Sequence, residues 1–284
     1  MNKTEFYKKF NNIDPKDELK GVDGLNQILF VRLSMDGLEE MHTYSTDERM
    51  YENFEFEAFQ SIEDTKQYIL KLLNRVEDGN AVYWFIRRKD DNKLIGTAGL
   101  LLLDYHNQSI EWGFGVDPDL WGQGYTLQIM EALKTYVFED LELNRLYGTT
   151  FVSNERTIAS LQATGMKEEG ILREFSMKNG QFIDGWKYSM LKDEYVSSKK
   201  ENTSNSDSAR DYKDSEIIEI VSSVLETKTI NIESNISNTT KWDSLNHMAI
   251  MIELVNKTNI KFNPGQIAKA TSITSILDIL NSQK

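Results

Sequence analysis

The sequence predicts an α+β domain with a mixed central sheet flanked by helices, followed by a small all-α domain of four helices. In the first part, predicted strands come before two late amphipathic helices, an order typical of α+β folds. Residues 196–211 are rich in Ser, Asn and charged side chains, the composition of a flexible linker. Residues 212–284 contain helical apolar patterns. We therefore expect domains at 1–195 and 212–284, joined by a linker at 196–211.

The first domain begins with an expected helix at 4–11 and a strand at 28–33. Residues 45–79 have a largely helical pattern, with Ser61 or Glu63 near a helix start. The next expected elements are strands at 81–88, 93–103 and 109–116, a helix at 125–139, a strand at 145–152, a helix at 154–165, and strands at 174–178 and 185–191. Polar turns between the first three of these strands predict an antiparallel meander.

The second domain contains three apolar helical patterns: "DSEIIEIVSSVLE", "DSLNHMAIMIELVNKT" and "ITSILDILNS". Asp243 and Ser244 have the side chains of a helix start. A buried stripe is predicted at Leu245, Met248, Ala249, Ile252 and Val255, which recur at helical spacing. His247 is expected at the surface.

Composition excludes several kinds of site. The chain has no cysteine, which rules out disulfides and thiolate chemistry, and its three histidines are isolated, so no metal site is expected. The net charge of −13 argues against nucleic acid as a partner. No long apolar window or signal-peptide pattern occurs, so we expect a cytoplasmic protein without a membrane partner.

The loop "LWGQGY" places Gly122 and Gly124 directly before a predicted helix. Glycines let the backbone approach a ligand closely, and free N–H groups at a helix start bind anions such as a pyrophosphate. A glycine pair is also common in ordinary turns. A nucleotide-binding βαβ unit would offer glycines here too, but the antiparallel strands before the loop and the lack of a third glycine argue against it.

Together, "LIGTAGL", "IEWGFGVDPDLWGQGY" and "SNERTIASLQATGMKEEGILRE" resemble segments of the GNAT N-acetyltransferase superfamily, nearest to the branch that acetylates ribosomal-protein N-termini and polyamines. The resemblance covers residues 25–195. It implies acyl-CoA or acetyl-CoA as cofactor, its pantetheine arm along Gly113–Val116, and Asn154 orienting that arm. The backbone implied for the pyrophosphate is that of Trp121, Gly122, Gln123, Gly124 and Tyr125.

The same resemblance implies that Glu111 is the base that takes a proton from the attacking amine, directly or through water. The alternative is a solvated or ion-paired strand residue. The sequence departs from the family at Asp119, where a Gln or Arg is frequent, and at Leu161, where many members have a tyrosine acid. The branch's usual Glu in the loop helix is Gln128.

Residues 212–284 resemble an acyl carrier protein, centred on "WDSLNHM". This resemblance implies that Ser244 carries 4′-phosphopantetheine, with a phosphopantetheinyl transferase and an acyl-loading enzyme as partners. A phosphodiester at a helix N-terminus is stabilised by the free N–H groups and the helix dipole. After Asp243 the helix has one acid, Glu253, so docking through the apolar Met248, Ile250 or Met251 is expected.

Three functions follow from these patterns. The first is an N-acyltransferase that moves an acyl group from acyl-CoA, or from its own carrier domain, to a small-molecule primary amine such as a nucleotide-linked amino sugar, with a protein N-terminus or a polyamine as alternative acceptors. The second is a carrier or recruitment protein whose GNAT domain binds but does not turn over. In the third, the carrier domain serves an unrelated pathway.

Overall fold

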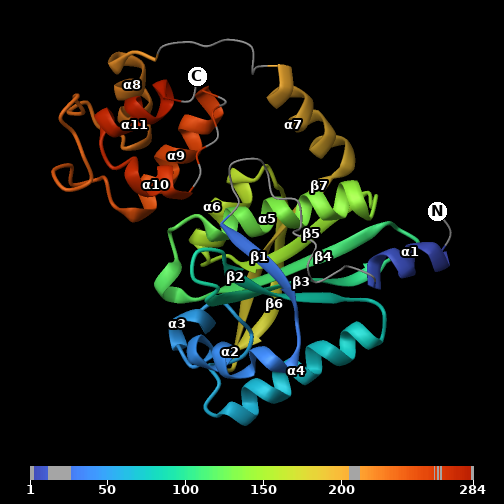
Figure 1. Ribbon diagram of the computed structural model, residues 1–284. Coiled ribbons are helices and arrows are strands. Elements are labelled where there is room, and N and C mark those ends of the chain that lie inside the picture. Colours follow the sequence, from blue (N-terminus) through green and yellow to red (C-terminus); the bar gives the residue numbers. More distant parts are fainter. Residues whose placement is uncertain are drawn as a thin grey trace. The chain divides into compact units, whose positions relative to one another are not determined.

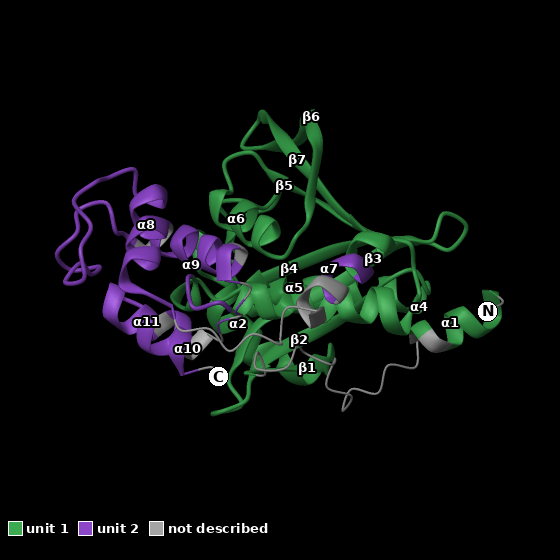
Figure 2. Ribbon diagram, turned by 90° about the horizontal axis from the view of Figure 1, so that it is seen from above, with its two compact units in different colours: residues 1–121, 125–195 green, residues 122–124, 196–284 purple. Residues whose placement is uncertain are grey.

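The computed structural model describes residues 3–11, 27–204, 212–258, 260, 262 and 264–282. They form two compact units, one of residues 1–121 and 125–195 and one of residues 122–124 and 196–284 (Figure 2). Among the described residues, no helix combines the length and apolar character needed to cross a membrane.

A mixed seven-stranded sheet with the order β1-β2-β3-β4-β5-β7-β6 organises the first unit (Figure 1). Its strands are β1 (Ile28–Arg32), β2 (Val82–Arg88), β3 (Leu94–Asp104), β4 (Ser109–Val116), β5 (Arg145–Phe151), β6 (Lys167–Lys178) and β7 (Gln181–Leu191). The predicted meander is confirmed, because β2, β3 and β4 pair antiparallel in chain order. Strands β4 and β5 run parallel, and this junction divides the sheet.

The parallel pairing of β4 with β5 is short. It joins Ser109 to Arg145, Ile110 to Leu146 and Glu111 to Tyr147. Beyond Glu111, the strand β4 stays paired with β3 on its other edge up to Val116. Within the described strands, the edge of β4 that faces β5 therefore has no ladder partner along Gly113–Val116. At this point the indole of Trp112 packs over Gly148, where a Cβ would lie 2.3 Å from the ring.

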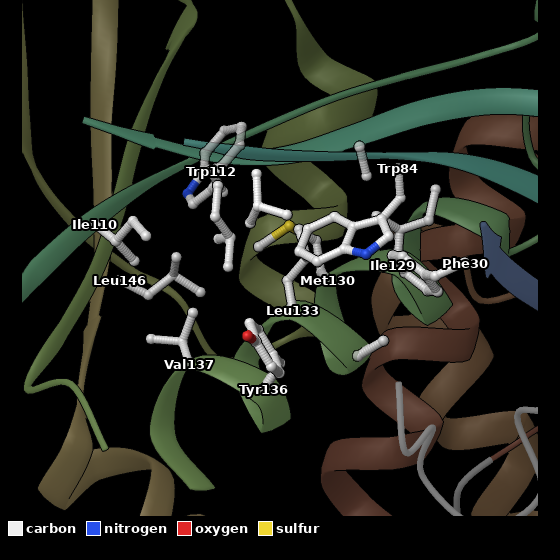
Figure 3. Packing of buried hydrophobic residues seen from close by; sticks show 14 of the residues in the cluster. Phe30, Trp84, Ile110, Trp112, Ile129, Met130, Leu133, Tyr136, Val137 and Leu146 are labelled. Atoms are coloured by element: carbon white, nitrogen blue, oxygen red, sulfur yellow. The ribbon is translucent and has the colours of Figure 1, made fainter. Parts of the chain in front are cut away.

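One face of the sheet packs against α5 (Tyr125–Thr135), which continues into a π-helical turn, η3 (Tyr136–Asp140). Trp84 and Trp112 project from the sheet toward Ile129, Met130 and Leu133 of the helix (Figure 3). Helix α1 (Lys3–Asn11) adds two buried phenylalanines to the same core, and α6 (Glu155–Ala163) adds Leu161. This core fixes where α5 begins relative to β4.

The opposite face is covered by α2 (Leu38–Ser45) and α4 (Ile62–Glu77), with the short helices η1 (Met35–Gly37) and α3 (Glu48–Tyr51) beside them. Ser61 caps α4 by accepting a hydrogen bond from Asp64 N, as predicted. Residues 52–60 are irregular rather than helical. Phenylalanine and glutamate alternate there, and the ring centroids of Phe56 and Tyr68 lie 5.5 Å apart. The apolar side chains of this segment therefore recur every two residues rather than at helical spacing.

Helix α7 (Lys192–Ser204) extends into the segment expected to be a flexible linker, so residues 196–204 are helical. Residues 205–211 lie outside the described part of the chain. The second unit contains α8 (Asp214–Val224), α9 (Ser244–Thr258), α10 (Pro264–Lys269) and α11 (Ile273–Asn281).

The predicted buried stripe of α9 is wrong. The buried residues are His247, Ile250, Met251 and Leu254. Met248, Ala249, Ile252 and Val255 are half-buried, and the side chain of Leu245 lies outside the described side chains. Helix α9 carries apolar residues on two sides, and helical spacing alone does not tell which side is buried. His247, expected at the surface, is 8% exposed.

Candidate active site

Glu111 lies at the last paired position of β4, beside Tyr147 of β5. Its chain neighbour Ile110 is fully buried in the α5 core, so Glu111 points to the opposite face of the sheet. Burial raises the pKa of the half-buried Glu111 carboxyl, the positive charge of Lys187 lowers it, and the negative charge of Glu55 raises it further. The structure thus gives this carboxyl a partly dehydrated setting at the end of a strand ladder.

The loop before α5 has the backbone geometry expected for close approach. Gly122 and Gly124 have φ angles of 75° and 79°, values that favour glycine. Tyr125 begins α5, so its N–H lies in the first turn, where no intrahelical acceptor exists. Gln123 stands between the two glycines.

Trp121 makes two hydrogen bonds within the protein, and its expected contact with a pyrophosphate stays a prediction. Its backbone N–H donates to Pro118 O at 3.3 Å, so this amide is already bonded. Its indole Nε1 donates to Val116 O at 2.9 Å and ties the loop to the end of β4. The Val116 carbonyl is therefore occupied by a protein donor.

Two arginines near this loop were missed by the sequence analysis. Arg49 of α3 donates to the carboxylate of Asp119 at 2.7 Å and also pairs with Asp47, so the acid that departs from the family pattern shares one cation with a second acid. The Arg156 guanidinium lies 4.4 Å from the centroid of the Trp121 ring. These residues are distant in sequence, and no local pattern connects them.

Asn154 caps α6, and its side chain accepts a hydrogen bond from Thr157 N at 3.3 Å. Its expected contact with a pantetheine arm stays a prediction. Leu161 is fully buried in the core, so the position of the family's tyrosine acid is a packing position here. Gln128 is buried as well and accepts from Gln27 N at 3.0 Å.

Ser244 is the first residue of α9, but its side chain lies outside the described side chains. Asp243 precedes it and accepts a hydrogen bond from Asn246 N at 2.8 Å, which confirms the predicted cap. His247 accepts from Trp242 Nε1 at 3.2 Å and donates from Nε2 to Ile267 O at 3.0 Å. Burial lowers the pKa of His247, which fits this neutral tautomer.

Within the described residues, no group of three or more His, Cys, Asp or Glu side chains is placed to hold a metal ion.

Comparison with known proteins identifies relatives of the first unit. Residues 27–167 match the acetyltransferase (GNAT) domain family. An uncharacterized N-acetyltransferase, p20 of Bacillus licheniformis, is 25% identical over 58% of this chain and 93% of its own length. The spermidine N(1)-acetyltransferase of Vibrio cholerae is 23% identical over 60% of this chain and 96% of its own length.

Solved structures share the fold. The spermidine N-acetyltransferase of Vibrio cholerae, solved in complex with CoA and spermine, superimposes with a TM-score of 0.53 at 21% sequence identity. The superposition covers 60% of this chain and 98% of that one. The first unit therefore has the fold of these enzymes.

Proposed function

We propose that this chain, whose residues 27–167 match the acetyltransferase (GNAT) domain family, is an N-acyltransferase that transfers an acyl group from acyl-CoA to a small-molecule primary amine, with Glu111 as the base. The observation that carries the proposal is the position of Glu111. It is half-buried, its pKa is raised by burial, and it lies where the β4–β5 ladder ends.

In this mechanism the carboxylate of Glu111 accepts a proton from the acceptor's ammonium group, directly or through one water. The neutral amine then attacks the acyl carbon, a C–N bond forms and the C–S bond breaks. The proton that the attacking nitrogen loses balances the proton that the leaving sulfur gains, so the products are an amide and a thiol. A backbone N–H of the Trp112–Gly115 stretch is the proposed donor to the carbonyl oxygen. Because a raised pKa brings a carboxyl closer to neutral pH, partial burial makes Glu111 a stronger base than an exposed glutamate.

The donor would lie along the unpaired edge of β4 at Gly113–Gly115. The open edge offers N–H and C=O groups that an extended amide chain can pair with, in the manner of an added strand. The N–H groups of Gly122, Gln123, Gly124 and Tyr125 would hold the pyrophosphate, helped by the positive end of the α5 dipole. Asn154 would orient the arm. The ion pair of Asp119 with Arg49 would offset part of the charge that repels phosphate there.

We further propose that Ser244 carries 4′-phosphopantetheine and that the second unit is an acyl carrier. Support comes from the sequence "WDSLNHM", from the Asp243 cap, and from the start of α9 at Ser244. An acyl group on this arm would present the same pantetheine end as acyl-CoA. Tethering would give it an effective concentration on the order of mM, so donation to the first unit in cis is favoured.

The acyltransferase proposal is tested by thiol release with acetyl-CoA and a panel of primary amines that includes nucleotide-linked amino sugars, spermidine and a peptide N-terminus. We expect turnover by the wild type and a large loss in Glu111→Gln. No turnover with any donor on any amine would refute the enzyme and leave the recruitment role.

The carrier proposal is tested by intact mass after co-expression with a phosphopantetheinyl transferase. We expect the mass of one phosphopantetheine group on the wild type and none on Ser244→Ala, with Ser237→Ala as a matched loop control that is still modified. An unmodified wild type would refute it. Unchanged acylation kinetics with every donor after Ser244→Ala would show that the carrier serves another pathway.

A further inference from the structure

Lys187 of β7 places a cation on the face of the sheet that carries Glu111, which we call the acceptor face. It is paired in register with Thr149 of β5, and its Nζ lies 4.8 Å from the centroid of the Tyr147 ring. Among the described residues, the Lys187 ammonium has no hydrogen bond and no ion pair with a carboxylate. A half-buried ammonium with these surroundings retains donors for an anion.

Arg145 provides an internal comparison, because its Cζ lies 5.5 Å from the centroid of the same Tyr147 ring. Its charge is already used. Nη1 donates to Glu169 Oε1 at 2.6 Å and to Ser189 Oγ at 3.2 Å. This bonding lowers the pKa of Glu169 to about 2, so the pair stays ionised. Of the two cations on the Tyr147 ring, only Lys187 is left to meet a ligand.

Across the acceptor face, the Glu111 carboxylate, the Tyr147 phenol and the Lys187 ammonium come from three adjacent strands, β4, β5 and β7. Burial, and then the charge of Glu111, raises the pKa of Tyr147, so the phenol stays neutral between two opposite charges. Glu55 adds a second negative charge near Glu111. The face is thus negative at Glu111 and positive at Lys187.

We propose that Lys187 is a specificity-determining residue that binds an anionic group of the acceptor, so the acceptor carries a phosphate or carboxylate in addition to its amine. This inference rests on the proposed acyltransferase function. The amine meets Glu111, and the anion meets Lys187 one to two interstrand spacings away, roughly 5–10 Å. A polyamine has a second cation where this acceptor has an anion, and Lys187 repels it.

The test compares four acceptors with acetyl-CoA: glucosamine 6-phosphate, 4-aminobutyrate, glucosamine and spermidine. Wild type, Lys187→Met and Lys187→Glu are assayed beside Lys167→Met, a control at an exposed lysine that pairs with Glu194. For the wild type we expect kcat/KM to favour an anionic acceptor over glucosamine by about tenfold, which equals about 1.4 kcal/mol. Preference for the phosphate or for the carboxylate identifies the anion.

In Lys187→Met the preference for an anionic acceptor should disappear because the KM for that acceptor rises. In Lys187→Glu the preference should shift toward spermidine, whereas Lys167→Met should match the wild type. Equal effects of Lys187→Met on all four acceptors, with a shifted acid limb of the pH profile, would overturn the inference and leave Lys187 as a positioning charge for Glu111. A wild-type preference for spermidine would also overturn it.

Calorimetric binding of glucosamine 6-phosphate and 4-aminobutyrate separates this inference from the proposed function. Lys187-dependent binding without acylation of any amine would refute the acyltransferase proposal and keep the anion site. Acylation without any Lys187-dependent difference in binding or KM would refute the anion site and keep the acyltransferase.

Discussion

A methyl group added at Gly148 would clash at the place where β4 and β5 stop pairing. In Gly148→Ala the new Cβ would lie 2.3, 2.6 and 2.7 Å from three ring atoms of Trp112. Trp112 is 7% exposed and stacks on Phe114 with ring centroids 5.4 Å apart, so the indole has little room to move. The substitution therefore overpacks the α5 core at the end of the β4–β5 ladder.

Overpacking a well-packed core costs about 1–3 kcal/mol. For a unit of this size each kcal/mol lowers the melting temperature by about 2–4 °C. We expect the thermal transition of the first unit, followed by scanning calorimetry, to fall by about 2–12 °C. Acetyl transfer should fall as well, because the displaced indole belongs to Trp112, the residue that follows Glu111.

Gly113→Ala is the matched control, one strand away. A Cβ there would meet only Leu101 Cδ2, the flexible end of a side chain, at 3.3 Å. Its melting temperature should stay close to that of the wild type. Trp112→Leu should relieve the clash, so the double variant with Gly148→Ala should be more stable than the sum of the single effects predicts. Equal melting temperatures for Gly148→Ala and Gly113→Ala would refute the reasoning.

Three further predictions concern Glu111 and the second unit. Glu111→Gln should lower kcat by about 10²–10⁴ and abolish the acid limb of the pH–rate profile. Because burial raises the pKa of Glu111, the acid limb of the wild type should lie above pH 4.5. An acid limb that persists in Glu111→Gln would exclude Glu111 as the base. The pKa of His247 is lowered in the fold, so its contribution to stability is complete above the unfolded-state pKa of about 6.5 and is lost as the pH falls below it. Hydrogen-exchange protection of α9 should therefore drop between pH 7.5 and 5.5, and less so in His247→Gln; equal pH dependence in both proteins would contradict this. Asp243→Ala removes the acceptor for Asn246 N and should lower the protection of α9 by about 1 kcal/mol, while Asp243→Asn should lower it by less.

Local chemistry made several elements predictable from sequence. The capping side chain of Ser61 acts within its own helix turn, and the β2–β4 meander is set by apolar strands with polar turns between them. Both depend on residues close in the chain, where periodicity and capping rules apply.

The rest of the site depends on contacts between distant residues. The end of the β4–β5 ladder depends on the packing of Trp112 on Gly148, and the ring of Tyr147 receives Lys187 from a strand forty residues later. In α9, a neutral His247 occupies a buried position that a hydropathy pattern assigns to the surface, because its partners Trp242 and Ile267 are supplied by the fold. No local pattern contains this information.

The bond from Trp121 to Val116 sets a limit on an extended molecule that adds to β4. Since the carbonyl of Val116 is already taken by an indole donor, such a molecule loses its backbone partner at that residue and has to turn toward the start of α5. The distance from this turning point back to Glu111 is fixed by one strand segment. If the proposed donor lies along β4, Trp121 would therefore set how far its reactive carbon lies from the Glu111 carboxylate.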